Sequence, residues 1–169
     1  MVTRLAVVED LQKLKTMFDK IVKVMETNNV FIWNEYYPYE EFENDIQNKN
    51  LYVVINNDKI ISAFGLFNNV NGSNCFEWND KNAKALYLGR FGVNPDYQKC
   101  GYGAKTINEA IKIAKNFGAK YLRLQVVDTN IPATNFYKKV GFNQAYGKFE
   151  EHIDETNTTL TEYGFEIKL

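Results

Sequence analysis

The stretch Val93–Ala114, VNPDYQKCGYGAKTINEAIKIA, decides how the middle of this chain folds. A turn marked by Pro95 leads to Gly101 and Gly103, and apolar residues then recur every three or four positions, as in a helix with one buried face. The first amides of a helix lack acceptors within the helix, and the helix dipole makes that end positive. The stretch therefore predicts a turn that binds an anion, although two spaced glycines before a helix more often form a turn alone.

Five elements are expected before the strand that leads into this stretch. Arg4–Glu9 is short and rich in valine and leucine, as in a strand, and Asp10 is placed to cap an amphipathic helix that follows it. A second, weaker helical face begins at Tyr39. Leu51–Ile55 and Lys59–Phe67 flank a turn-forming Asn-Asn-Asp cluster, which predicts a hairpin.

Strands and helices alternate in the rest of the chain. Two glycines interrupt the predicted strand Ala85–Val93, which indicates a bulge or the close approach of a ligand. Tyr121–Val127 alternates as a strand, Asn130 is placed to cap a short helix, and Gln144–Phe149 and Glu162–Leu169 are expected to be strands. The order β-α-α-β-β-β-α-β-α-β-β predicts an α/β protein with a twisted, mixed central sheet of about six or seven strands and about four flanking helices.

The bulk composition narrows the function classes. A length of 169 residues fits one domain, 1–169, and a formal net charge of -1 disfavours a nucleic-acid binder, which needs an excess of Lys and Arg. Two distant cysteines and one histidine predict neither a disulfide framework nor a metal site. The N-terminus turns charged too early for a secretory signal, and no apolar run could cross a bilayer. We therefore expect a soluble, cytoplasmic protein without metal, nucleic-acid or membrane partners.

The turn lacks the features of two common phosphate-binding loops. It has no Gly-Lys-Ser/Thr ending, which disfavours Mg-ATP chemistry, and no complete Gly-x-Gly-x-x-Gly dinucleotide fingerprint. A second motif follows the later strand, with the spacing Asn130-x-x-Ala133-x-x-Phe136-Tyr137-x-x-x-Gly141-Phe142. With both motifs in this order and separation, Leu86–Phe142 resembles the GNAT superfamily of acyl-CoA-dependent N-acetyltransferases, and the expected sheet is accordingly GNAT-like.

The resemblance implies that coenzyme A occupies the turn. Gln98, Gly101 and Gly103 match the family positions that wrap the CoA pyrophosphate. Four further residues would contribute mainly backbone amides to the same contact: Lys99, Cys100, Tyr102 and Ala104. The strand residues Phe91, Gly92 and Val93 match the bulged strand that pairs with the pantetheine arm, and the resemblance implies that the Val93 amide faces the thioester carbonyl.

The second motif supplies the remaining implied roles. Asn130 and Phe136 match cofactor contacts, and Tyr137 matches the tyrosine that protonates the departing thiolate, although a core tyrosine is the alternative. Acetyl transfer to an amine needs a neutral nucleophile, a stabilised oxyanion and a protonated leaving group. Direct attack needs no covalent enzyme intermediate, which agrees with a sequence that has no Ser-His-Asp constellation.

The general base and the acceptor stay open at this point. Tyr87 stands where some members carry a carboxylate, so the base could be water-relayed, Glu77 of the preceding loop, or unnecessary. Trp33, Tyr36 and Tyr37, together with Tyr87, are candidate acceptor contacts, or aromatics that close the core. The second helix carries acidic residues that would attract a cationic amine, although a solvated helix face is the favoured interpretation. These residues are Glu40, Glu41, Glu43 and Asp45.

The sequence thus favours one function and leaves one alternative. The expected function is transfer of an acetyl group from acetyl-CoA to a primary amine of a small molecule or a protein. The alternative is a CoA-binding sensor or scaffold of the same fold, which the missing strand carboxylate keeps open. A homodimer is expected at the level of the family alone.

Overall fold

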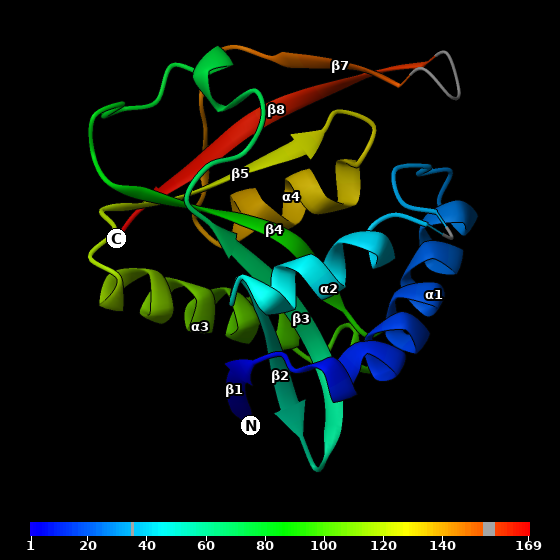
Figure 1. The fold of residues 1–169 in the computed structure, drawn as a ribbon. Helices are drawn as coiled ribbons and strands as arrows, with labels where there is room; N and C mark the ends of the chain where they lie inside the picture. The colour runs from blue at the N-terminus through cyan, green and yellow to red at the C-terminus, as the bar shows by residue number, and fades with distance from the viewer. Residues whose placement is uncertain (35, 154–157) are drawn as a thin grey trace. The chain divides into compact units, whose positions relative to one another are not determined.

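The computed structural model describes residues 1–34, 36–153 and 158–169 (Figure 1). The chain divides into two units: Met1–Leu66 with Gly89–Ala110, and Phe67–Leu88 with Ile111–Leu169. Three elements begin in one unit and end in the other: β3 (Lys59–Phe67), which enters the second unit only at Phe67, β4 (Ala85–Val93) and α3 (Tyr102–Asn116). Each unit is considered by itself.

The first unit combines two helices with a hairpin and one further strand. Its elements besides β4 and α3 are β1 (Val2–Leu5), α1 (Leu11–Thr27), α2 (Tyr39–Gln47), β2 (Leu51–Asn56) and β3 (Lys59–Phe67). Asn57 and Asp58, with φ of 48° and 59°, join β2 to β3. Left-handed conformations at both central residues are what a two-residue hairpin with matched twist requires. The predicted helices and hairpin are therefore confirmed.

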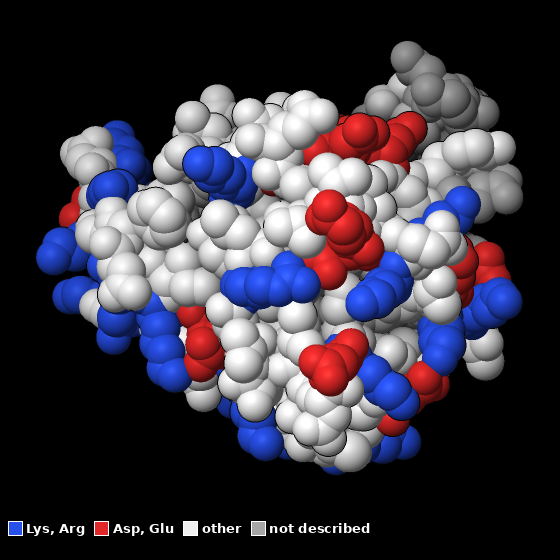
Figure 2. Space-filling model, turned by 60° about the horizontal axis from the view of Figure 1, so that its bottom comes forward, with Lys and Arg blue, Asp and Glu red and all other residues white. Residues whose placement is uncertain are grey.

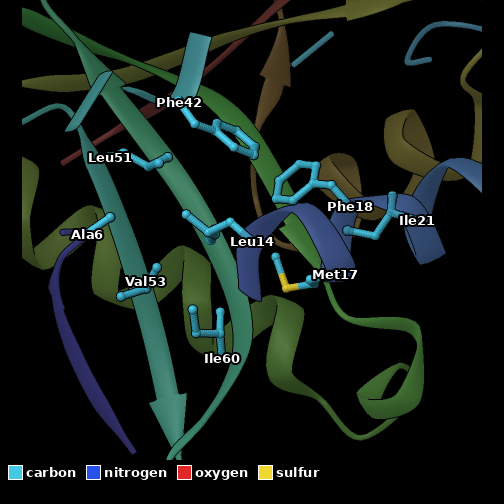
Figure 3. Close-up of a cluster of buried hydrophobic side chains, with 10 residues drawn as sticks. Ala6, Leu14, Met17, Phe18, Ile21, Phe42, Leu51, Val53 and Ile60 are labelled. Atoms are coloured by element: carbon cyan, nitrogen blue, oxygen red, sulfur yellow. The ribbon is translucent and has the colours of Figure 1, made fainter. Parts of the chain in front are cut away.

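One side of α1 builds the core of this unit. Leu14, Phe18 and Ile21, spaced by four and three residues, lie on the same side of α1 and pack against strand residues that include Val53 (Figure 3). Phe42 of α2 meets Phe18 edge-on, with ring centroids 4.9 Å apart. The 3–4 spacing that predicted the helix is thus the spacing of its buried contacts.

The predicted capping role of Asp10 is wrong. Asp10 precedes α1, but its side chain makes no capping hydrogen bond. Its carboxylate instead pairs with the Arg4 guanidinium at 2.6 and 2.9 Å and accepts the Val7 amide at 3.0 Å. These contacts hold the pKa of Asp10 below its ordinary value. Asp10 therefore fastens the end of β1 rather than the start of the helix.

The second unit is built around β5 and β8. Its elements besides parts of β4 and α3 are β5 (Tyr121–Val127), α4 (Ile131–Lys139), β6 (Asn143–Gln144), β7 (Phe149–Ile153) and β8 (Thr158–Lys168). β5 pairs parallel with β4 and antiparallel with β8, and β7 runs alongside β8 (Figure 1). Gly118 and Gly141, with φ of 76° and 101°, follow the ends of α3 and α4, where a left-handed glycine commonly ends a helix.

The strands follow the hydrogen-bonded order β1-β2-β3-β4-β5-β8-β6, with β7 paired to β8. The predicted mixed sheet is confirmed, and it has eight strands rather than six or seven. The difference lies in the tail, where the predicted strand Gln144–Phe149 does not form. Gly147 has a φ of 106° and Tyr146 forms an isolated bridge with Glu77, so the chain leaves β6 and re-enters the sheet as β7.

The surface charges and the cysteines do not indicate a particular binding partner. Figure 2 shows basic and acidic side chains interspersed over the face that it draws, in keeping with a net charge of -1. Cys75 and Cys100 are exposed free thiols. Of the helices that the structure describes, none is long and apolar enough to cross a membrane.

Candidate functional site

The end of β4 belongs to the first unit and is irregular at Arg90. This non-glycine residue has a φ of 52°, within the strand and just before Phe91. Gly92 has a different reason for being glycine: a Cβ there would lie 2.8 Å from Ile21 Cδ1 and 3.0 Å from Phe18 Cζ. The predicted irregularity of the strand is therefore present. At Gly92, however, the close neighbour is the α1 side chains, not a ligand.

Three side chains from the α2 region hold Arg90. Its Nε lies 3.1 Å from Asp45 Oδ2, its Nη1 donates to the Tyr37 hydroxyl at 2.6 Å, and its Nη2 lies 3.4 Å from Glu41 Oε2. The guanidinium also lies over the Tyr37 ring, 5.2 Å from the centroid. These residues, named here the Arg90 clamp, hold the backbone at the start of the predicted pantetheine strand in a sparsely populated conformation.

The clamp corrects the interpretation of the acidic residues. Asp45 is 2% exposed and Glu41 is half-buried against Arg90, so these two do not belong to a solvated face. Glu40 and Glu43 are exposed, as expected. The signal for Asp45 was present in the sequence, because it lies three residues after the buried Phe42 and so on the inward side of the helix.

The turn before α3 is exposed and turned by two left-handed residues. Lys99 has a φ of 60° and Gly101 a φ of 78°, and a Cβ on Gly101 would meet no atom within 4 Å. The Lys105 amide donates to the Gly101 carbonyl at 3.2 Å, so the three amides before it belong to the first turn and have no acceptor within the helix. Gln98 and Cys100 are exposed beside them. Successive amides at the start of a helix are the kind of backbone that is able to bind an anion.

Neighbouring side chains fix this turn in the first unit. The Tyr102 ring lies edge-on to Tyr97, with centroids 6.0 Å apart, and Lys105 Nζ lies 5.0 Å from its centroid. One turn later, Thr106 Oγ1 lies 2.6 Å from Ser62 Oγ of β3, a buried hydrogen bond. Lys105 is a second cation at the turn that the sequence motif did not single out. Gly103 and Ala104 lie in the first turn of α3, half-buried and exposed respectively.

The second motif lies in the second unit. Asn130 Oδ1 accepts the Ala133 amide at 3.2 Å, so the predicted cap of α4 is confirmed. Tyr137 is buried between Phe136 and Phe142, with ring centroids at 5.4 and 5.7 Å. Burial raises the pKa of the Tyr137 phenol well above its ordinary value. The hydroxyl therefore stays protonated at neutral pH and is able to donate a proton or a hydrogen bond.

Tyr87 is buried in an aromatic cluster of the second unit. It meets the Trp78 ring edge-on at 6.3 Å, and Phe76 packs against the same cluster. A cavity of about 300 Å³ opens beside it. The cavity is lined by Asn68, Asn69, Lys81, Ala83, Lys84, Ala85, Tyr87 and Arg123. Arg123 is buried and pairs with Glu166 at 3.1 Å, so the free charges along this cavity are those of lysines.

The structure does not bring the three N-terminal aromatics into one cluster. Trp33 packs on Phe18 of the core, with ring centroids 5.2 Å apart, as the core interpretation predicts. Tyr37 belongs to the Arg90 clamp, and Tyr36 is 65% exposed. Glu77, a candidate base, lies exposed in the loop before β4.

One titratable group was missed at the level of sequence. Glu162 of β8 is half-buried, and burial together with the nearby Glu151 carboxylate raises its pKa to about 7. The strand was predicted, but nothing in its spacing distinguishes Glu162 from Glu166, which pairs with Arg123. Within the described residues, no group of three or more His, Cys, Asp and Glu side chains could hold a metal ion.

Comparison with known proteins identifies relatives for this arrangement. A family model described as "Acetyltransferase (GNAT) family" matches residues 18–142. A 66-residue stretch is 33% identical to thialysine N-epsilon-acetyltransferase of Bos taurus and covers 39% of this chain, while spanning only 39% of that relative's length.

Solved structures share the fold over nearly the whole chain. A GNAT family acetyltransferase of Streptococcus agalactiae is 14% identical with a TM-score of 0.76, covering 99% of this chain and 95% of that one. The PaiA N-acetyltransferase of Thermoplasma acidophilum, solved in complex with coenzyme A, is 22% identical with a TM-score of 0.68, covering 99% and 98%. At these identities the likeness is one of fold.

Proposed function

The chain belongs to the GNAT family of acetyltransferases, and from this premise we propose that it transfers an acetyl group from acetyl-CoA to a primary amine by direct attack on the thioester. The observation that carries the proposal is the exposed turn Gln98–Ala104, where left-handed Lys99 and Gly101 precede the unpaired first-turn amides of α3. A row of backbone amides at a helix start favours an anionic group such as a pyrophosphate.

The turn supplies the proposed pyrophosphate contacts. We propose that the backbone amides of Lys99 to Ala104 contact the pyrophosphate. The open space at Gly101 and the exposure of the Gln98 side chain support this proposal. Lys99 and Lys105 add positive charge. In the same unit, Phe91, Gly92 and Val93 follow the Arg90 clamp, and we propose that this strand end pairs with the pantetheine arm and that the Val93 amide donates to the developing oxyanion.

The second motif supplies the proposed acid. We propose that the Tyr137 hydroxyl donates to the departing thiolate, a role that needs a protonated phenol, and burial raises the pKa of this phenol. We propose Asn130 and Phe136 as cofactor contacts. Because Asn130 Oδ1 already caps α4, the side-chain nitrogen of Asn130 is the group that would contact the cofactor.

The acceptor is proposed to be an amine of a small molecule or a protein. Tyr87 is supported as an acceptor contact by the cavity beside it. Tyr36 is supported by its exposure, whereas Trp33 and Tyr37 would act by holding the core and the Arg90 clamp in place. We propose further that both units make one N-acetyltransferase domain, since β4 and α3 run from one into the other, and that it acts in the cytoplasm, as a monomer or homodimer.

The binding step is tested by placing a carboxylate in the turn. Gly103→Asp adds a negative charge to the first turn of α3, where an acid favours the helix but repels a pyrophosphate. We expect the Kd for CoA, measured by calorimetry, to rise by about tenfold or more. Asn108→Asp adds the same charge on an exposed position of the same helix and should leave the Kd within about twofold. If both variants changed the Kd for CoA equally, the proposal that the turn binds CoA would be wrong.

The transfer step is tested by thiol release from acetyl-CoA. The amine panel contains thialysine, lysine, spermidine and a peptide with an N-terminal alanine. Acetylation of any of them, with the product identified by mass, supports the enzyme. Tight CoA binding without transfer to any amine would favour the sensor or scaffold that the missing strand carboxylate left open.

A further inference from the structure

We propose that Glu162 takes the proton from the acceptor amine during acetyl transfer, an inference that rests on the proposed function. The strand position that carries a carboxylate in some family members is Tyr87, Glu77 is exposed, and Glu166 is bound to Arg123. Glu162 differs from them in its place in the sheet, its burial and its neighbours.

Glu162 of the antiparallel strand β8 lies beside the carboxyl end of β5. Its Cα is in register with Val127, the last residue of β5, on one side and with Phe149 of β7 on the other. β5 runs parallel to β4, and ligands of open α/β sheets bind beyond the carboxyl ends of such strands. Asn130 follows Val127 by three residues and opens α4. Glu162 is therefore next to the strand end where the second motif begins.

The register also places Glu162 on the same face of the sheet as Tyr87. Tyr87 is in register with Arg123, and side chains alternate along a strand, so Arg123 and Val127 share a face. Val127 is opposite Glu162, which therefore shares it too. This is the face on which Trp78 contacts both Tyr87 and Arg123. The proposed proton acceptor and the proposed acceptor contact thus belong to one side of the second unit.

The charges around Glu162 favour a cation. From β7, Glu151 lies two residues from Phe149 and shares its face. From β5, Arg123 is on this face but is bound to Glu166, and within β8 Tyr163 points to the other side. The loop that covers Phe149 at Gly72 carries the titratable groups Cys75, Glu77 and Asp80. Lys148 of the adjoining turn is paired with Glu150.

Two carboxylates without a described cationic partner form a site suited to an ammonium group. Burial and the Glu151 charge raise the pKa of Glu162 to about 7. A base with a pKa near the working pH combines a populated carboxylate with the ability to hold the proton that it takes.

The proposed step balances as follows. A Glu162 carboxylate oxygen first takes one proton from the ammonium ion, which frees the nitrogen lone pair. The nitrogen then forms a bond to the acetyl carbon while the bond from that carbon to sulfur breaks. The Tyr137 hydroxyl gives its proton to the thiolate and regains one from the newly acylated nitrogen, and solvent takes the proton from Glu162. The net reaction converts an ammonium ion and acetyl-CoA into an amide, free CoA and one released proton.

The test is the pH profile of kcat/KM, with the most rapidly acetylated amine of the panel. For the wild type we expect a rise through an apparent pKa of about 7, and Glu162→Gln should lower kcat by about 100-fold and abolish that rise. Glu151→Gln removes the neighbouring like charge and should move the rise to lower pH. Glu150→Gln changes an exposed carboxylate of β7, the strand that carries Glu151, and should alter neither kcat nor the pH at which kcat/KM rises.

Two results would overturn the inference. One is a Glu162→Gln variant that binds CoA normally and keeps kcat within about threefold, with the wild-type profile. The other is a Glu151→Gln variant whose pH profile of kcat/KM does not shift. If Glu162 had only a structural role, removing the Glu151 charge would leave that profile unchanged. A wild type that acetylates none of the amines contradicts the proposed function instead, so the two failures are distinguishable.

Discussion

Gly92, Asn130 and Tyr137 each hold the fold at the position where the motif assigns them a role in binding or catalysis. Gly92 admits the Phe18 and Ile21 side chains, Asn130 caps α4, and Tyr137 packs against Phe142. Replacing any of them by alanine would mix lost packing with lost chemistry. The informative substitution keeps the shape and removes one polar group.

Tyr137→Phe is such a substitution. It keeps the ring between Phe136 and Phe142 and removes the hydroxyl that would protonate the thiolate. We expect kcat to fall by about 100-fold, with the Kd for CoA within about twofold of the wild type. Tyr146→Phe, at a position 79% exposed, is the matched control and should leave both constants unchanged. A full kcat in Tyr137→Phe would make this tyrosine a core residue alone.

At the scale of elements, the Arg90 clamp ties α2 to β4 within the first unit. Asp45 is almost fully buried and the Arg90 side chain is 18% exposed, so this pair is largely removed from water. Burial raises the pKa of Asp45 and the Arg90 charge lowers it, with a net rise. The pair therefore costs desolvation, and its value lies in holding a non-glycine residue at a φ of 52°.

Asp45→Asn tests the clamp. It leaves Arg90 with Tyr37 and the more exposed Glu41, and we expect the free energy of unfolding, from urea titration, to fall by about 2 kcal/mol. Glu43→Gln, exposed on the same helix, should change it by less than about 0.5 kcal/mol. If the clamp positions the strand end, Asp45→Asn also raises the KM for acetyl-CoA. A stability loss without a change in KM would limit the clamp to the fold.

Two carboxylates should make the stability of the whole molecule depend on pH, and their effects have opposite signs. Asp10 has a lowered pKa, so its stabilising contribution is present above its unfolded pKa and is lost as the pH falls. Glu162 has a raised pKa, so its contribution is present below the unfolded value, about 4.5, and is lost as the pH rises through about 7. Stability is therefore greatest in mildly acidic solution as far as these two groups decide it.

Glu162→Gln should remove the loss on the alkaline side. We expect the variant to be more stable than the wild type by about 2 kcal/mol above pH 7, a value reduced for partial exposure, with the difference closing towards pH 4.5. Urea titrations across this range measure it, with Glu150→Gln as the control that changes little. A variant that gains stability while losing turnover would have the behaviour of a functional carboxylate held at a cost to the fold. A constant difference across the pH range would contradict the raised pKa.

Much of the fold was predictable because it depends on local periodicity. The buried face of α1, the two left-handed turn residues of the hairpin and the Asn130 cap are all set by neighbours within a few positions. The tail was not, because pairing of Phe149–Ile153 with β8 is a contact between segments that no local pattern announces. The spacing from Phe42 placed Asp45 on the inward side of α2, but its partner Arg90 lies forty-five residues away and could not be predicted from that spacing. The pairing of Asp10 with Arg4 depends on the path of the chain between β1 and α1, which the capping pattern does not contain.

By itself, the sequence determined the family, the mixed sheet and the turn that precedes α3, since two spaced motifs and helical periodicity are properties of the linear chain. The tertiary structure alone decided which polar groups lose water and which charges become neighbours. It placed Arg90 among three partners, buried Tyr137 and set Glu162 beside Glu151. The physical reason is that desolvation and Coulomb interactions depend on distance in space, and the linear order of residues does not contain it.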